Sequence, residues 1–159
     1  MKNFKLLFIM ATLLCFSLAS CSKNEQQDIH SNKVKTAKFT FSIEGLEKDD
    51  IGHFGFSSAN AEGNTTIWKV NGETKSNQNL IHVTEDVLKS GAVCVVELLN
   101  PVVTITAGLS IVNNNSADGG SLSSPIVYSY KAEINGDVVK DIKQQAVVVG
   151  EVVNLQFQY

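Results

Sequence analysis

The chain has 159 residues, a formal net charge of −3, three cysteines and no arginine. That length suits one domain and is short for two. A mildly acidic chain without arginine lacks the basic face and the bidentate donors that nucleic-acid binding favours, so we predict no nucleic-acid partner. The missing arginine also weakens the case for tight recognition of a phosphate or carboxylate ligand.

The first 20 residues have the organisation of a bacterial export signal. Lys2 and Lys5 form a short positive segment, and the uncharged, mostly apolar run 6–18 follows. As a helix this run would reach roughly 20 Å, which is less than the about 30 Å of a bilayer core. We therefore predict that residues 1–20 are a cleaved signal peptide and do not span a membrane.

The apolar run ends in Leu18-Ala19-Ser20-Cys21. This motif closely resembles the lipobox of bacterial lipoproteins, and the tract that follows resembles lipoproteins of the Bacteroidetes type. The resemblance implies that Cys21 carries a diacylglyceryl group on its sulfur, becomes the mature N-terminus and is usually N-acylated as well. Two or three acyl chains hold a protein stably on a membrane. Because Ser22 and not aspartate follows Cys21, the resemblance favours the outer membrane, with periplasmic and surface orientations both open.

Residues 21–35 are polar and are predicted to be a flexible tether between the lipid anchor and a domain at 36–159. About 14 flexible residues give a reach of roughly 20 Å, which lifts the domain clear of the lipid headgroups. Beyond the signal, the chain has 11 lysines and 16 acidic residues, a formal charge of −5. An ordinary secretory signal, with Cys21 incidental, is the alternative.

Alternation of apolar and polar residues predicts short strands along the whole domain. We expect them at 37–43, 51–57, 66–70, 80–83, 92–99, 102–112, 126–134, 137–143 and 152–159. The run 92–99 is apolar on both faces, which predicts a central strand buried on two sides. Asn100-Pro101 is expected to break that strand, and Gly108 is expected to mark a bulge.

Turn signals separate these strands. Asn71-Gly72 and Asn135-Gly136 each favour a type I′ hairpin turn, in which both central residues have positive φ. The polar segment 73–79 after the first turn is expected to be an edge strand or an exposed excursion. Residues 84–90 resemble one helical turn, with Thr84 as N-cap and Gly91 as the stop.

Eight or nine short strands, and no stretch of ten residues with a helical period, predict an all-β protein. The expected fold is a single antiparallel β-sandwich with at most one short helical turn near 84–90. The spacing of strands and turns along the chain resembles that of immunoglobulin-like or transthyretin-like domains. No Cys-Trp-Cys framework supports a true immunoglobulin domain, and the resemblance implies no activity.

Cys94 is the one cysteine left for the domain, since Cys15 leaves with the signal and Cys21 is lipidated. It lies in an apolar, valine-rich run without a nearby cation. We therefore predict a buried, unreactive side chain and no internal disulfide.

The sequence contains no recognised catalytic, phosphate-binding or metal-binding motif, so we predict no catalytic residue, metal or cofactor. His30, His53 and His82 share no metal-ligand spacing, although they could converge in space. Asp49-Asp50 with His53 could form an acid–base cluster, but charged turns are far commoner. Trp68 falls at an inward position, which favours a core residue over a sugar-stacking platform.

The segment 113–124, rich in Asn, Ser and Gly, is the longest loop expected in the domain. Loops carry function on rigid sandwiches, so Asn113, Asn114, Asn115 and Asp118 are predicted as a binding element. The composition equally suits a flexible spacer. Asp118 lacks the run of carboxylates that a calcium loop needs.

These patterns favour a non-enzymatic outer-membrane lipoprotein that presents a binding or structural module to a protein or glycan ligand. One alternative is a subunit of an envelope secretion or uptake machine that offers a strand edge to a partner. A small envelope enzyme is a second alternative, which a concave pocket gathering His53, His82 or paired acids would favour. A polymerising pilin of the fimbrillin type is not expected, because its assembly uses cleavage after an arginine.

Overall fold

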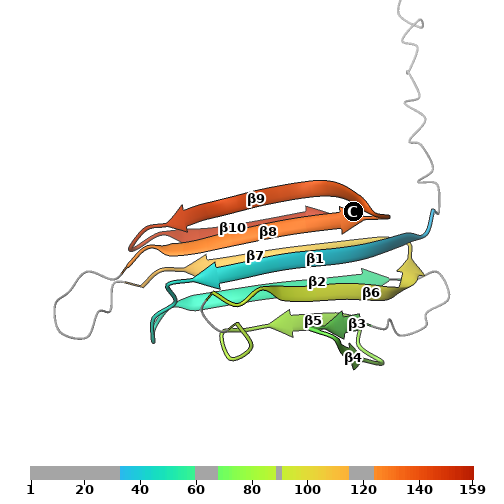
Figure 1. The fold of residues 1–159 in the computed structure, drawn as a ribbon, viewed down its shortest axis with the longest axis horizontal. Coiled ribbons are helices and arrows are strands. Elements are labelled where there is room, and N and C mark those ends of the chain that lie inside the picture. The colour runs from blue at the N-terminus through green and yellow to red at the C-terminus, as the bar shows by residue number, and fades with distance from the viewer. Residues whose placement is uncertain (1–32, 60–67, 89–90, 115–123) are drawn as a thin grey trace, which may run out of the picture. The chain divides into compact units, whose positions relative to one another are not determined.

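The computed structural model describes residues 33–59, 68–88, 91–114 and 124–159. They form ten strands: β1 (Lys35–Glu44), β2 (Ile51–Ala59), β3 (Trp68–Val70), β4 (Glu73–Lys75), β5 (Leu80–Val83), β6 (Cys94–Val102), β7 (Thr104–Val112), β8 (Ile126–Ile134), β9 (Asp137–Val147) and β10 (Val152–Gln158) (Figure 1). The signal peptide and most of the tether lie outside the described residues. Within the described residues, no helix is long and apolar enough to cross a membrane.

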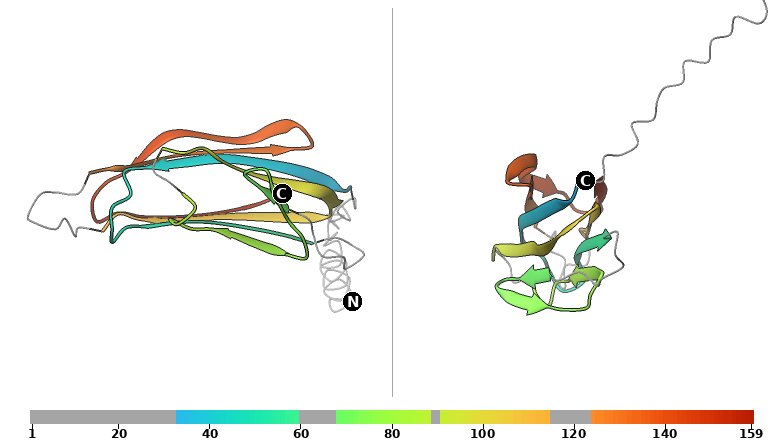
Figure 2. Two further views of the ribbon diagram at one scale, coloured as in Figure 1. Left: turned by 60° about the horizontal axis from the view of Figure 1, so that its bottom comes forward. Right: turned by 90° about the vertical axis from the view of Figure 1, so that its right-hand side faces the viewer.

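The strands form two antiparallel sheets packed face to face (Figure 2). The larger sheet has the order β4-β3-β6-β1-β8-β9, and the smaller sheet has the order β10-β7-β2-β5. The connection from β1 to β2 carries the chain from one sheet to the other, as does the connection from β6 to β7. This arrangement confirms the predicted all-β class and the single antiparallel β-sandwich.

Aromatic side chains from both sheets fill the space between them. Phe41 of β1 stacks on Phe54 of β2 with ring centroids 4.1 Å apart, and Phe39 lies 4.6 Å from Phe56. Trp68 is fully buried beside Phe56, which confirms the core position predicted for it. Large rings that alternate with polar residues along β1 and β2 thus fix which face of each strand is inward.

Both Asn-Gly turns have the predicted backbone. Asn71 and Gly72 have φ values of 48° and 88°, and Asn135 and Gly136 have values of 53° and 89°. The polar return from the first turn is the short edge strand β4, as expected.

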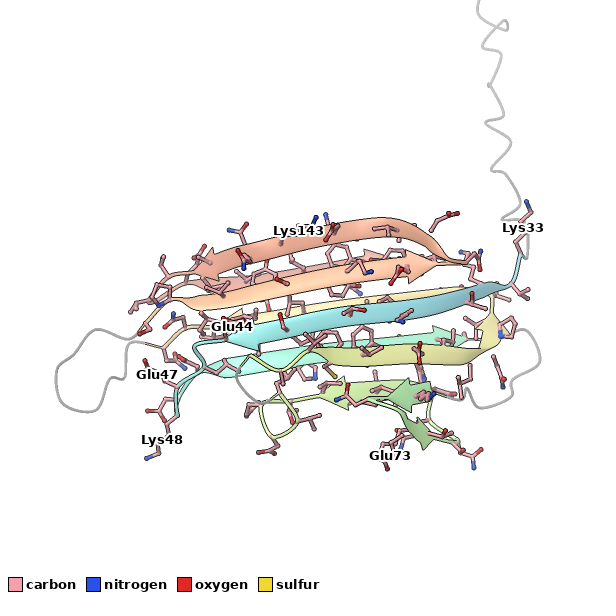
Figure 3. All side chains as sticks on the ribbon, in the orientation of Figure 1. Lys33, Glu44, Glu47, Lys48, Glu73 and Lys143 are labelled. Carbon is pink, nitrogen blue, oxygen red and sulfur yellow. The ribbon has the colours of Figure 1, made fainter. Side chains whose placement is uncertain are left out.

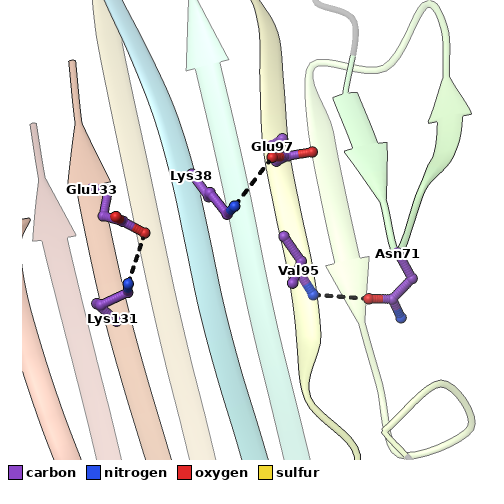
Figure 4. Close-up of polar contacts among 6 residues, drawn as sticks. All are labelled: Lys38, Asn71, Val95, Glu97, Lys131 and Glu133. Atoms are coloured by element: carbon purple, nitrogen blue, oxygen red, sulfur yellow. Dashed lines mark hydrogen bonds and ion pairs between the residues drawn. The ribbon is translucent and has the colours of Figure 1, made fainter. Parts of the chain in front are cut away.

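Each turn asparagine also bonds a strand outside its own hairpin, a feature that the sequence did not predict. The Asn71 Oδ1 atom accepts the Val95 N–H at 2.8 Å (Figure 4), and the Asn71 N–H donates to the Val95 carbonyl at 2.8 Å. Asn135 makes the same pair of bonds with Thr36, at 2.9 Å and 3.0 Å. The side-chain amide therefore continues the backbone ladder past the end of the hairpin.

The predicted helical turn is one hydrogen-bonded turn. The Val87 and Leu88 N–H groups donate to the Thr84 carbonyl at 2.9 Å and 3.0 Å, and no helix is present among the described residues. Leu88 is buried and anchors the turn to the core.

The strand at 92–99 differs from its prediction. It begins at Cys94 and is buried on one face only, since Val93 is 62 % exposed and Leu99 is 47 % exposed. Cys94 itself is buried, as predicted. Among the described residues, the smaller sheet covers one face of the larger sheet. The apolar side chains of Val93 and Leu99 are not on that covered face, so they meet solvent.

The break expected at Asn100-Pro101 is also absent, because β6 continues to Val102. Instead, the pairing with β1 shifts: Leu98 pairs with Ala37 and Val102 with Lys35. Residues 99–101 therefore bulge opposite one residue of β1, where a proline without an N–H is tolerated.

Candidate functional site

The two sheets differ completely in charge. The strands of the smaller sheet, β2, β5, β7 and β10, contain no Asp, Glu, Lys or Arg. All the charged residues that lie on strands belong to the larger sheet, whose outer face carries the ion pairs Lys38–Glu97 and Lys131–Glu133 at 3.6 Å and 3.0 Å (Figure 4). Of the charged residues labelled in Figure 3, Glu44, Glu73 and Lys143 lie on the larger sheet, and Lys33, Glu47 and Lys48 lie outside the strands. We call the outer surface of the smaller sheet the neutral face.

A hollow of about 490 Å³ lies on the neutral face. Its floor holds Gly55 and Gly108, which are directly paired residues of β2 and β7. Around them stand hydroxyl, amide and imidazole side chains together with one leucine: His53, Ser57, Leu80, Thr106, Ser110, Asn154 and Gln156. Leu109 and Leu155 also line the hollow, but their side chains face the core. The lining therefore offers many hydrogen-bond donors and acceptors and no formal carboxylate or ammonium charge.

The missing side chains of the two glycines create the hollow. A Cβ atom on Gly108 would meet only the Gly55 and Leu155 carbonyl oxygens, both at 3.9 Å, so the backbone there has room for a side chain. The bulge predicted at Gly108 is wrong, because β7 pairs with both neighbours in unbroken register through this residue. A glycine inside a strand can mark either a bulge or a site where a ligand approaches the backbone closely. Because Gly108 forms no bulge, we interpret it as a site of close approach.

His53 and His82 meet at the edge of the hollow, on adjacent strands β2 and β5. The His53 Nε2 atom lies 2.7 Å from the His82 Nδ1 atom, a hydrogen bond between the rings, whose centroids are 4.9 Å apart. The convergence that the sequence left open for these two residues is therefore present.

Gly55 makes this contact sterically easy. It is the register partner of His82, and a Cβ atom on it would lie 3.4 Å from the His53 Cε1 atom. Partial burial lowers the pKa of His53, the neighbouring His82 lowers it further, and Glu85 acts in the opposite direction. The pair therefore favours the neutral form of His53.

The acid–base cluster considered for Asp49, Asp50 and His53 does not form. The carboxylate of Asp50 is buried and accepts the backbone N–H groups of Glu47 and Asn114, each at 2.8 Å. His53 contacts His82 instead. Within the described ranges no group of three His, Cys, Asp or Glu residues gathers as a metal site.

The binding element predicted at 113–124 is only partly within the described residues. Asn113 is fully buried, and its Nδ2 atom donates to the Ser124 and Val147 carbonyls at 3.0 Å and 2.9 Å. Asn113 thus holds the two ends of the loop together, and we no longer expect it to contact a ligand. Asn114 is half-buried and donates to the Asp49 carbonyl. Asn115 and Asp118 lie outside the described residues, so their predicted role stays a prediction.

A catalytic arrangement at the hollow would need a nucleophile or an acid beside His53. Ser110 is the register partner of His53 and lies on the same face, yet no hydrogen bond joins its hydroxyl to the ring. Backbone N–H groups of paired strands are used in the sheet, so they offer no ready oxyanion donors.

No protein-family model and no curated protein matches the chain. Solved structures do match its fold. It resembles DUF4425 proteins. A DUF4425 family protein from Bacteroides ovatus matches with a TM-score of 0.54 and 15 % identity, over 80 % of this chain and 95 % of that one.

Two further solved structures are similar to the same extent. A DUF4425 domain of unknown function from Bacteroides vulgatus has a TM-score of 0.55 and 12 % identity, over 79 % of this chain and 94 % of that one. A protein from Parabacteroides distasonis, solved by NMR in a calcium-bound form, has a TM-score of 0.52 and 16 % identity, over 79 % and 93 %. At such identities the likeness carries the fold alone.

Proposed function

We propose that this chain is a lipid-anchored outer-membrane protein whose β-sandwich is a non-catalytic binding module for a neutral glycan. The observation that carries the ligand class is the uncharged outer face of the smaller sheet, with its glycine-floored hollow. Surfaces of soluble domains normally mix charges of both signs, as the larger sheet does. A whole sheet without charge is therefore a feature that needs a functional reason.

The chemistry of the hollow fits a sugar. An ionic ligand would need a counter-charge within hydrogen-bond reach, and the lining has none. Sugar hydroxyl groups both donate and accept hydrogen bonds. The hydroxyl and amide side chains of the hollow can also do both: Ser57, Thr106, Asn154 and Gln156. A volume of about 490 Å³ lies within the range of small-molecule sites. Trp68 is in the core, so recognition would rely on hydrogen bonds more than on stacking with that ring.

The anchor is supported by the lipobox-like sequence that ends at Cys21. Residues 21–35 then supply a tether of roughly 20 Å reach. Cys21→Ala should prevent acylation and leave the protein outside the membrane fraction of fractionated cells. A Cys21→Ala variant that is still processed and still extracted only with detergent would refute the anchor.

A second candidate is a subunit of an envelope machine that accepts a partner strand. Edge strand β9 is poorly suited to this, because its pairing with β8 has two register shifts and it carries the charges of Lys140, Asp141 and Lys143. Both features disfavour pairing with a further strand. Edge strand β10 has seven residues and no charge, so it is the better edge for strand addition. Crosslinking from Asn154 in intact cells separates the candidates: a stoichiometric protein partner favours the machine.

Capture on immobilised polysaccharides tests the ligand class. We expect the protein to be retained by at least one of starch, mannan and a β-glucan, and to be eluted by the free sugar. Retention that depends on an acidic polysaccharide and disappears in salt would contradict a neutral ligand. Failure to bind any neutral polymer would leave the anchor proposal intact and remove the glycan proposal.

A further inference from the structure

We propose that His53 and His82 form a binding site for a late first-row divalent metal ion, with zinc as the representative. The site uses only these two side chains and stands whether or not the hollow binds a glycan. It rests on the 2.7 Å approach of two ring nitrogens from adjacent strands.

The spacing of the two ring nitrogens is close to that of two ligands of one metal ion. Imidazole nitrogens bind Zn²⁺ at about 2.0–2.1 Å, so two such ligands in a tetrahedral site lie about 3.4 Å apart. The nitrogens of His53 and His82, now 2.7 Å apart, must therefore separate by about 0.7 Å. Each ring must also turn until its lone pair points at the shared ion and not at the other ring. Both rings stand on the outer face, His82 exposed and His53 half-buried.

A metal ion can replace the hydrogen bond between the two rings without a net change in bound protons. In the neutral pair one ring donates its N–H to the unprotonated nitrogen of the other. Binding of the metal requires both facing nitrogens to be unprotonated, so the donor ring must carry its proton on its other nitrogen. This is a change of tautomer, with no net release of a proton and no redox step.

The donor set selects the class of metal. Neutral imidazole suits zinc, copper and nickel, whereas calcium and magnesium require several oxygen ligands. The described cysteine, Cys94, is buried in the larger sheet and cannot contribute a thiolate. With two protein ligands and no third His, Cys, Asp or Glu in a described cluster, the remaining positions would be open to water or to a ligand.

The surroundings favour a cation. Glu85 acts electrostatically on His53 and stabilises positive charge there. No lysine or arginine lies on the strands of the smaller sheet. Lys75 of β4 lines a second hollow together with His82, and its charge is paired with Glu73 at 2.6 Å. Because His53 also lines the hollow, open metal positions would lie beside the bound ligand.

Isothermal titration of the full-length protein, purified in detergent and stripped with EDTA, tests the site with Zn²⁺ and Ni²⁺. We expect saturable binding of one ion per chain, unchanged by an excess of Ca²⁺. His53→Gln and His82→Gln should each lower the affinity at least about tenfold, because even the loss of an outer partner of a metal ligand commonly costs 10–100-fold. His30→Gln, which changes the third histidine of the chain, is the matched control and should bind like the wild type.

A second measurement avoids any dependence on the folding of variants. Zn²⁺ should protect His53 and His82, and not His30, from modification by diethyl pyrocarbonate in the wild-type protein, as mapped by mass spectrometry. The proposal is overturned by absence of saturable binding, by wild-type affinity in the His53→Gln or the His82→Gln variant, or by displacement of the metal by Ca²⁺.

Discussion

Gly55 and Gly108 pair directly across β2 and β7, and their missing side chains leave the floor of the hollow open. Neither glycine has the positive φ that would require glycine for backbone reasons. The two residues therefore cost the sheet side-chain packing without a conformational need, which agrees with a role in admitting a ligand.

Filling the floor should separate binding from stability. Gly108→Val places a side chain where its Cβ meets only carbonyl oxygens at 3.9 Å, and valine favours strands, so we expect the free energy of unfolding to stay equal or rise by up to about 1 kcal/mol. Glycan retention should be lost. Urea melts and the polysaccharide capture assay measure the two effects.

Gly52→Val is the contrasting variant. The Cβ of this buried glycine would lie 2.9 Å from the Leu46 Cδ1 atom, so overpacking should destabilise the domain by about 1–3 kcal/mol. If Gly108→Val destabilised as much as Gly52→Val, the floor of the hollow would be packed and not open.

The two Asn-Gly turns should differ in how much they stabilise the domain. Gly72 and Gly136 have φ values of 88° and 89°, and a Cβ on either meets nothing within 4 Å, so valine causes similar local strain of about 1–2 kcal/mol at both. Gly136→Val should destabilise more, because the β8–β9 register positions the buried Tyr130, whereas β4 pairs over three residues only. Equal losses in urea melts, or a larger loss for Gly72→Val, would contradict this.

Asn113 should act as a structural residue. Asn113→Ala removes two hydrogen bonds and leaves the Val147 carbonyl without this donor in a buried position, so we expect a loss of about 1–3 kcal/mol. Asn154→Ala on the neutral face should change stability by less than about 0.5 kcal/mol. Chemical denaturation of both variants gives the comparison, and a stable Asn113→Ala variant would return this residue to the list of candidate ligand contacts.

Stability should fall on mild acidification because of His53. Its pKa in the folded protein is lowered from the ordinary value of 6.5, so the unfolded chain binds more protons as the pH falls through 6.5. The free energy of unfolding should therefore decrease from pH 8 to pH 5. In His53→Gln that part of the pH dependence should be smaller, and in His30→Gln it should be unchanged. A His53→Gln variant with the full wild-type dependence would show that another group is responsible.

The fold could be predicted because alternation is a local signal. In β1 the pattern Phe39, Phe41 and Ile43 marks the inward face without knowledge of any partner strand. The same reasoning failed at 92–99, where Val93 and Leu99 are apolar but exposed, because an apolar residue does not report which side of a sheet is covered. Asn113 looked like part of a polar loop, since its partner Val147 is 34 residues away.

The candidate site was harder to predict for the same physical reason. The contact between His53 and His82, and the pairing of Gly55 with Gly108, depend on how β2 aligns with β5 and β7. A one-residue shift would place these side chains on opposite faces. One signal was nevertheless present in the sequence: four predicted strands without a single charged residue, which together form one sheet.

The most direct test of glycan binding at the neutral face is a chemical-shift map of the isotope-labelled protein, titrated with oligosaccharides from starch, mannan and β-glucan. We expect one of them to shift the backbone amide signals of Gly55, Ser57, Thr106 and Gly108 in a saturable manner, while those of Lys38 and Glu97 on the opposite sheet stay unchanged. Shifts confined to the charged face, or no saturable shifts with any of the three, would contradict the proposed function.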